Sequence, residues 1–72
     1  MKKIKKIKIR FNGKLKLIDA NSKMLNLIND FKIPIKKVAI ELNSEILDKK
    51  KLNNIKLKNN DIIEIVHFIG GG

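Results

Sequence analysis

The chain has no cysteine, tryptophan or tyrosine, and its 72 residues include one proline and three phenylalanines. Without cysteine there is neither a disulfide framework nor a thiolate metal site, which is compatible with a reducing compartment. The single histidine, His67, leaves too few ligands for a zinc site made by the protein alone. We therefore expect no metal centre and interpret His67 as an ordinary histidine at the rim of the domain.

Long apolar runs are also missing, since none approaches the roughly 18 residues needed to span a membrane. The lysine-rich start, residues 1–8, is not followed by an apolar segment, so we expect no signal peptide. These features predict a cytoplasmic protein without a membrane partner. A chain of this length buries only around 60% of its unfolded surface. The thin core leaves little room for an enclosed catalytic pocket.

Acidic residues are scarce as well: 17 Lys and Arg stand against 7 Asp and Glu, for a net charge of +10. A nucleic-acid surface is one explanation. The other is a biased composition, because lysine, isoleucine and asparagine dominate throughout. Only Arg10 has the bidentate fork of a guanidinium, and few aromatic rings are available for base stacking. We favour the compositional explanation and expect no nucleic-acid partner.

Hydrophobic alternation in the first part of the chain predicts a β-hairpin. Residues 7–11 carry apolar side chains at every second position, and residues 14–17 alternate again. Asn12-Gly13 lies between them and is the strongest short hairpin signal. Residues 7–11 and 14–17 are therefore expected to form an antiparallel pair.

The spacing of the apolar residues then changes from every second residue to the spacing typical of a helix. Asn21 and Ser22 are both good N-caps, and Pro34 disfavours helical geometry at the residue before it. The helix should therefore end near Phe31 or Lys32. Its apolar stripe follows the spacing i, i+3, i+4 and i+7 and consists of Met24, Leu27, Ile28 and Phe31, widened by Leu25.

Three further strands are predicted at 38–42, 45–47 and 62–68, with a turn at Asn43-Ser44. The polar connection 49–58 has three apolar anchors, Leu52, Ile55 and Leu57. In the last strand a carboxylate prefers water, which places Ile62, Glu64, Val66 and Phe68 on the outer face and Ile63 and Ile65 inward. The expected core between helix and sheet comprises Ile9, Phe11, Leu17, Leu27, Ile28, Phe31, Val38, Ile40, Ile63 and Ile65.

The chain ends in Gly70-Gly71-Gly72. Glycine is costly to order, and one interpretation is a tolerated, disordered end. The other is an arm that delivers the terminal carboxylate into a narrow channel, about 10 Å beyond the last strand. The arm, residues 70–72, would follow a domain formed by residues 1–69. Exposed apolar residues beside the arm suggest a contact site, formed by Val66, Phe68 and Ile69.

The predicted order of elements describes an α+β protein with a ubiquitin-like β-grasp, in which a mixed sheet of four to five strands packs on one main helix. Two segments carry a closer resemblance. Residues 38–46 are similar to a V-A-x-x-x-N-G-E-hydrophobic stretch, and residues 60–72 to a G-D-x-hydrophobic-E ending that finishes in Gly-Gly. On these segments the chain resembles the ThiS family of sulfur carriers in thiamine biosynthesis. Ser44 and Asn60 stand where the family usually has glycine; asparagine tolerates a left-handed conformation better than serine does.

This resemblance implies a function for the tail. A ThiF-like enzyme would adenylate the carboxylate of Gly72, and a sulfur donor such as a cysteine desulfurase would supply the sulfur of a thiocarboxylate. The thiazole synthase ThiG would receive that sulfur. The resemblance implies a carrier with no catalytic residue and no cofactor of its own, since the ATP is used by the adenylating enzyme.

Three alternatives remain at this stage. A MoaD-like sulfur carrier for molybdopterin has the same fold and tail, although the short length and the ending from Glu64 to Gly72 favour ThiS. A protein modifier would form isopeptide bonds through Gly72. A small basic nucleic-acid-binding protein would use its charge and leave the tail incidental.

Overall fold

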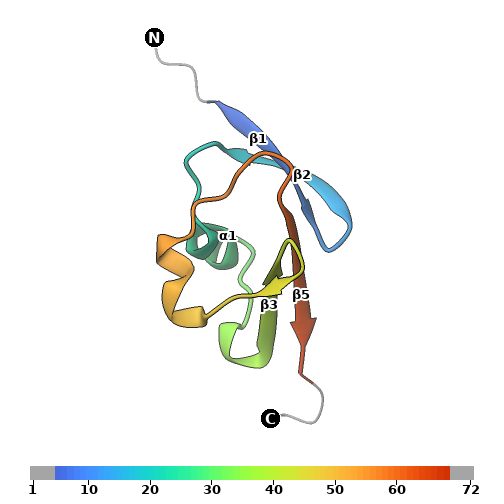
Figure 1. The fold of residues 1–72 in the computed structure, drawn as a ribbon, viewed down its shortest axis with the longest axis vertical. Coiled ribbons are helices and arrows are strands. Elements are labelled where there is room, and N and C mark those ends of the chain that lie inside the picture. Colours follow the sequence, from blue (N-terminus) through green and yellow to red (C-terminus); the bar gives the residue numbers. More distant parts are fainter. Residues whose placement is uncertain (1–4, 69–72) are drawn as a thin grey trace.

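The computed structural model describes residues 5–68 (Figure 1). Strands and helices alternate along the chain in the order expected for an α+β domain. The elements are β1 (Lys6–Phe11), β2 (Lys14–Asp19), α1 (Met24–Asp30), the 3₁₀ turn η1 (Ile35–Lys37), β3 (Val38–Leu42), β4 (Glu45–Ile46), the 3₁₀ segment η2 (Lys49–Asn54) and β5 (Ile62–His67).

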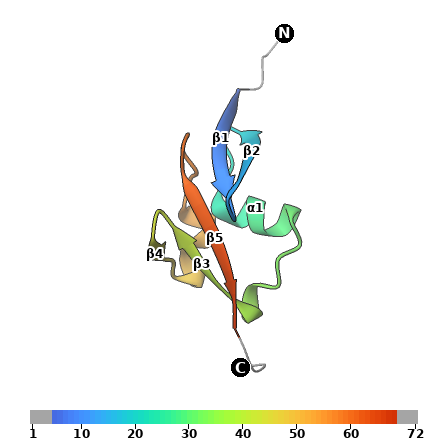
Figure 2. The same cartoon turned by 90° about the vertical axis from the view of Figure 1, so that its right-hand side faces the viewer.

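The five strands form one mixed sheet in the order β2-β1-β5-β3-β4. The last strand, β5, therefore lies in the centre, parallel to β1 and antiparallel to β3. Helix α1 packs on one face of the sheet, and the other face is open (Figure 2). This arrangement agrees with the predicted mixed sheet on one main helix.

Both predicted turns are made by residues with positive φ. Asn12 (φ 50°) and Gly13 (φ 83°) connect β1 to β2 and place Phe11 opposite Lys14. Asn43 (φ 51°) and Ser44 (φ 74°) connect β3 to β4. Such angles at two successive turn residues match the right-handed twist of the flanking strands. Ser44 takes the left-handed conformation despite its Cβ, as expected where the family carries glycine.

Helix α1 begins later than the two predicted caps, and neither Asn21 nor Ser22 caps it. Instead, Lys23 occupies the cap position, and its N–H donates to Oδ1 of Asn26 at 2.8 Å. The reason is tertiary. Residues 22–24 run alongside residues 55–57, with hydrogen bonds from Leu57 N to Ser22 O (3.0 Å) and from Met24 N to Ile55 O (2.8 Å). This extended pairing excludes helical geometry at residue 22.

The core lies between α1, η2 and the inner face of the sheet. The buried apolar side chains are Ile9, Met24, Leu27, Ile28, Val38, Ile40, Leu52, Leu57 and Ile63. Phe11 and Ile65 are half-buried against them, so most of the expected core is confirmed. The predicted anchors Leu52 and Leu57 are almost fully buried and hold the polar connection against the core.

Two members of the expected core are exposed. Leu17 is 70% exposed because the two-residue turn sets the register of β2. Lys16 stands opposite buried Ile9, so the neighbouring leucines take the outer face. Phe31 is 40% exposed: it lies at the end of α1 and packs edge-on against the ring of Phe11, with centroids 4.8 Å apart.

Candidate functional site

β5 is held by hydrogen bonds on both sides up to Ile65, and its C-terminal end is held from the β3 side. Just after β1, Asn12 N donates to Ile63 O at 2.9 Å. From β3, the pairing runs to His67, which lies opposite Val38. Beyond the strand, Phe68 N donates to Lys37 O at 3.0 Å. The chain is therefore positioned up to the last described residue, immediately before the tail predicted to be functional.

Asparagine and aspartate side chains hold β5 where the ladders end. Ile65 N donates to Oδ1 of Asn12 at 2.8 Å, and Ile62 N donates to Oδ1 of Asn43 at 2.8 Å. Each side chain satisfies a backbone donor that the neighbouring strand cannot reach. Each bond joins β5 to a turn of a neighbouring strand, so these contacts stabilise the register of the central strand.

Asp61 completes this arrangement at the start of β5. Its side chain is buried, with 8% exposure. One carboxylate oxygen accepts from Asn43 Nδ2 at 3.0 Å and the other from Lys58 N at 2.8 Å. Its carbonyl accepts from Arg10 N at 2.9 Å. Asp61 thus ties three segments together: the turn after β3, the connection before β5, and β1.

These positioning residues were not identified from the sequence. Asn43 was assigned to a turn, and its contact with Asp61 has no local signature in the sequence. A signal was present, because both lie inside the two segments that resemble the ThiS family. The two segments that carry the resemblance therefore contain strands β3 and β5 and also the hydrogen bond between Asn43 and Asp61.

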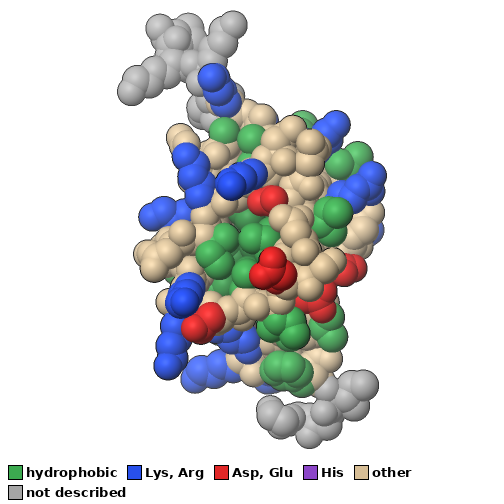
Figure 3. All heavy atoms as spheres, viewed as in Figure 1, with side chains coloured by type: hydrophobic (Ala, Val, Ile, Leu, Met, Phe, Trp, Pro, Cys, Tyr) green, Lys and Arg blue, Asp and Glu red, His purple; other side chains and the backbone are tan. Residues whose placement is uncertain are grey.

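Val66 lies on the outer face, as predicted, and Val66 and Phe68 are 49% and 50% exposed. Val66 stands opposite Ala39, whose small side chain does not cover it. Nζ of Lys49 lies over the ring of Phe68, 5.2 Å from the ring centroid. In Figure 3, hydrophobic side chains gather at the lower end of the molecule, where β5 finishes. This end of the sheet offers apolar surface to a partner.

The predicted arm Gly70–Gly72 and the predicted contact residue Ile69 lie outside the described residues. Within residues 5–68, no group of three or more His, Cys, Asp or Glu side chains is placed to hold a metal ion. His67 is exposed and pairs across the sheet with Val38. The described part of the site therefore supplies a positioned strand end and an apolar surface.

Comparison with known families decides the identity. The sequence model of the ThiS family matches residues 9–72, which include both the central strand and the glycine tail. The chain belongs to the ThiS family. Of the two sulfur-carrier families considered above, the matching one is that of thiamine biosynthesis. As a ThiS-type sulfur carrier, the protein is a carrier rather than a catalyst.

Relatives agree with this assignment over nearly the whole chain. A sulfur carrier protein ThiS from Bacillus subtilis is 35% identical over 65 residues, covering 89% of this chain and 98% of the relative. A crystal structure of the thiamine biosynthesis protein ThiS from Geobacter metallireducens superimposes with a TM-score of 0.80 at 28% identity. It covers 92% of this chain and 100% of that one. The predicted β-grasp is confirmed.

Two longer relatives contain a segment similar to this chain. Thiazole synthases from Magnetococcus marinus and Paramagnetospirillum magneticum are each 33% identical over 66 residues. The match covers 92% of this chain and 20% of each thiazole synthase. A ThiS-like segment therefore occurs there as one fifth of a longer polypeptide. Among the described residues of our protein, no helix has the length and apolar character to cross a membrane.

The buried carboxylate of Asp61 generates the first prediction. Asp61→Ala removes the acceptor of Asn43 Nδ2 and Lys58 N, and we expect the free energy of unfolding to fall by about 2 kcal/mol or more. Urea denaturation followed by circular dichroism measures the loss. Asp48→Ala is the matched control, because exposed Asp48 only accepts from Lys50 N at 2.9 Å and its loss should cost less. Equal losses for the two variants would contradict the role given to Asp61.

Proposed function

We propose that the carboxylate of Gly72 is the group that carries sulfur. The observation that supports this is the position of β5: the strand that leads to Gly70-Gly71-Gly72 is the central one, with neighbours on both sides. A tail that starts from a rigid strand has a defined origin. Three residues without side chains then extend its reach by about 10 Å. Such an arm presents a carboxylate to a narrow site on another protein.

The chemistry requires activation, because a carboxylate is a poor electrophile. An oxygen of the Gly72 carboxylate attacks the α-phosphate of ATP, forming an acyl-adenylate and releasing pyrophosphate. A persulfide sulfur then attacks the acyl carbon and expels AMP, giving an acyl disulfide. A thiol then attacks the cysteine sulfur of the donor in this acyl disulfide, forms a disulfide with the donor and expels the thiocarboxylate as the leaving group. This chain has no cysteine, so both sulfur nucleophiles belong to partners.

Three partners follow from these steps. A ThiF-like enzyme binds ATP and catalyses adenylation, so the carrier needs no cofactor of its own. A donor such as a cysteine desulfurase provides the persulfide. The thiazole synthase ThiG accepts the sulfur, and this partner is supported by the thiazole synthases in which a ThiS-like segment is part of the same chain. We place these reactions in the cytoplasm, where reduced thiols are maintained.

Docking to the adenylating enzyme is assigned to Val66, Phe68 and Ile69. Val66 and Phe68 are half-exposed and lie directly before the arm. A contact there would hold the origin of the arm while the glycines enter the active site. Apolar anchors of this kind supply most of the binding energy in many interfaces.

The arm is tested by deleting Gly72 or by changing Gly71 to valine. Deletion leaves a glycine carboxylate that is short by about 3.5 Å, and a misplacement of about 1 Å can cost a hundredfold in rate. Valine adds a branched Cβ that stiffens and widens the arm. Both changes should abolish ATP–pyrophosphate exchange with the adenylating enzyme while leaving the melting temperature unchanged. Exchange at the parental rate by the truncated chain would rule out the arm.

The docking surface is tested by Val66→Lys and Phe68→Asp. Each should weaken binding to the adenylating enzyme by about 1–4 kcal/mol without unfolding the domain, because both side chains are half-exposed. Isothermal titration measures affinity, and circular dichroism checks the fold. Ile46→Lys is a control, since Ile46 is exposed on β4 at the edge of the sheet. Unchanged affinity for the first two variants would place the contact elsewhere.

A further inference from the structure

Within residues 5–68, no strand lies beside the outer edge of β2. There β2 is the first strand of the sheet, and its described pairing is with β1 alone. Ala20 N donates to Lys5 O at 2.9 Å. Because hydrogen-bonded and non-hydrogen-bonded residue pairs alternate along an antiparallel pair of strands, this bond shows which residues of β2 are bonded to β1. It follows that Lys14, Lys16 and Ile18 turn their N–H and C=O groups toward β1. The groups of Leu15 and Leu17 point away from the sheet.

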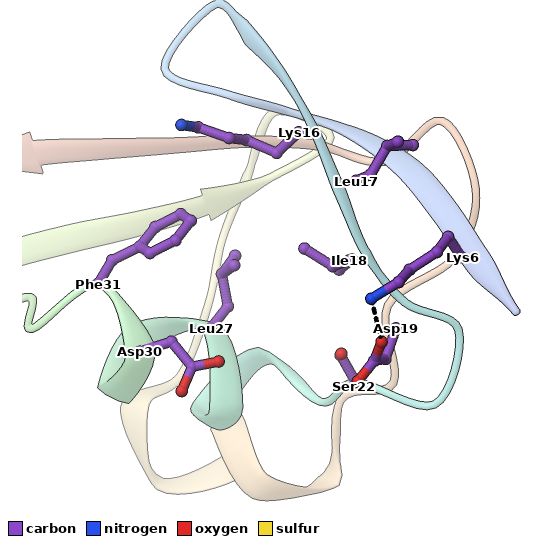
Figure 4. A pocket seen from close by; sticks show the side chains of 9 residues that line it. All are labelled: Lys6, Lys16, Leu17, Ile18, Asp19, Ser22, Leu27, Asp30 and Phe31. Carbon is purple, nitrogen blue, oxygen red and sulfur yellow. Dashed lines mark hydrogen bonds and ion pairs between the residues drawn. The ribbon is translucent and has the colours of Figure 1, made fainter. Parts of the chain in front are cut away.

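A groove separates this edge from the end of α1. Two adjoining hollows form it, of about 320 and 330 Å³. Lys16 and Phe31 line both, and Nζ of Lys16 lies 5.6 Å from the centre of the Phe31 ring. Figure 4 shows the first hollow, with Lys16 and Ile18 reaching from β2 and Leu27 and Phe31 from the helix side. The groove thus has apolar walls parallel to an unpaired strand edge.

Charge is distributed unevenly along the groove. The hollow near the hairpin is lined by Lys14 and Lys16 with Phe11, Asn12, Phe31 and Ile33, so none of the described residues that line it is acidic. At the other hollow, Asp19 and Asp30 balance Lys6 and Lys16. Lys6 is already paired there, with Nζ 2.6 Å from Oδ1 of Asp19. The hairpin end is therefore the part of the groove that attracts negative charge.

We propose that this groove binds an extended acidic peptide segment of a partner protein, which adds to the sheet as a strand beside β2. The backbone of the segment pairs with Leu15 and Leu17. Apolar side chains at alternate positions enter the two hollows, because every second residue of a strand points to the same face. Carboxylates of the segment lie against Lys14 and Lys16. This surface is on the edge strand and does not involve the tail.

A second copy of the chain is disfavoured as the occupant. Two β2 edges brought together would place Lys14 and Lys16 of one copy against the same lysines of the other. Edge lysines oppose such pairing, and the net charge of +10 adds to the repulsion. The same lysines favour a segment of opposite charge, so they select the partner as well as preventing self-association.

The test uses the full chain and a synthetic peptide in which a few acidic residues precede alternating isoleucine and threonine. We expect binding to slow hydrogen exchange at the N–H groups of Leu15 and Leu17, measured by NMR. A peptide N-methylated at alternate amides keeps the charge but loses the strand hydrogen bonds, and it should not bind. A peptide with lysines in place of the acids should not bind either.

Charge reversal in the protein supplies the second measurement. Lys14→Glu with Lys16→Glu should weaken binding about tenfold or more, since two attractive contacts become repulsive. Lys36→Glu with Lys50→Glu makes the same change in net charge at exposed positions away from the groove and should have little effect. Equal weakening by both pairs would overturn the proposal. Two further results would overturn it: NMR changes on addition of the acidic peptide that do not involve β2, or a single-stranded oligonucleotide that binds at the amides of Leu15 and Leu17 more tightly than the peptide does.

Discussion

The structure depends on the central position of its last strand. β5 has β1 on one side and β3 on the other, so most of its backbone groups are paired within the sheet. Where the ladders end, Asn12, Asn43 and Asp61 supply the missing partners. β5 is therefore held from both sides up to Ile65, and its end is held by β3 and by the bond from Phe68 N to Lys37 O. The tail can then consist of glycines alone, because the strand that precedes it is held in the sheet.

The order of strands also determines which surfaces remain available. The helix covers one face only, so Val66 stays exposed on the outer face, and Phe68 is exposed just after the strand. Placing the last strand in the centre moves β2 to the edge, where α1 does not fill the space beside it. The molecule therefore offers two separate surfaces: an apolar one next to the tail and a lysine-flanked groove on the edge strand. The partners proposed above would therefore bind surfaces that do not overlap.

Much of this fold could be predicted from local patterns. Period-two alternation, the Asn12-Gly13 turn and the helical stripe located the main elements, and Glu64 assigned the faces of β5 correctly. Local patterns could not predict which side chains of β2 point toward the core, because an alternation of lysine and leucine permits either set to point inward. The turn register decided it and exposed Leu17. The start of α1 depended on pairing between residues 22–24 and 55–57, and the role of Asp61 on contacts across the sheet.

The account rests on sulfur being carried at Gly72. The most direct measurement is mass spectrometry of the C-terminal proteolytic peptide after incubation with the adenylating enzyme, ATP, a cysteine desulfurase, cysteine and a reducing thiol. Exchange of one carboxylate oxygen for sulfur should add about 16 Da to the terminal residue, which is the sulfur acceptor expected in a chain without cysteine. Fragmentation that places the added mass on Gly72 is the predicted result. An unmodified terminus, or added mass on any other residue, would contradict the account.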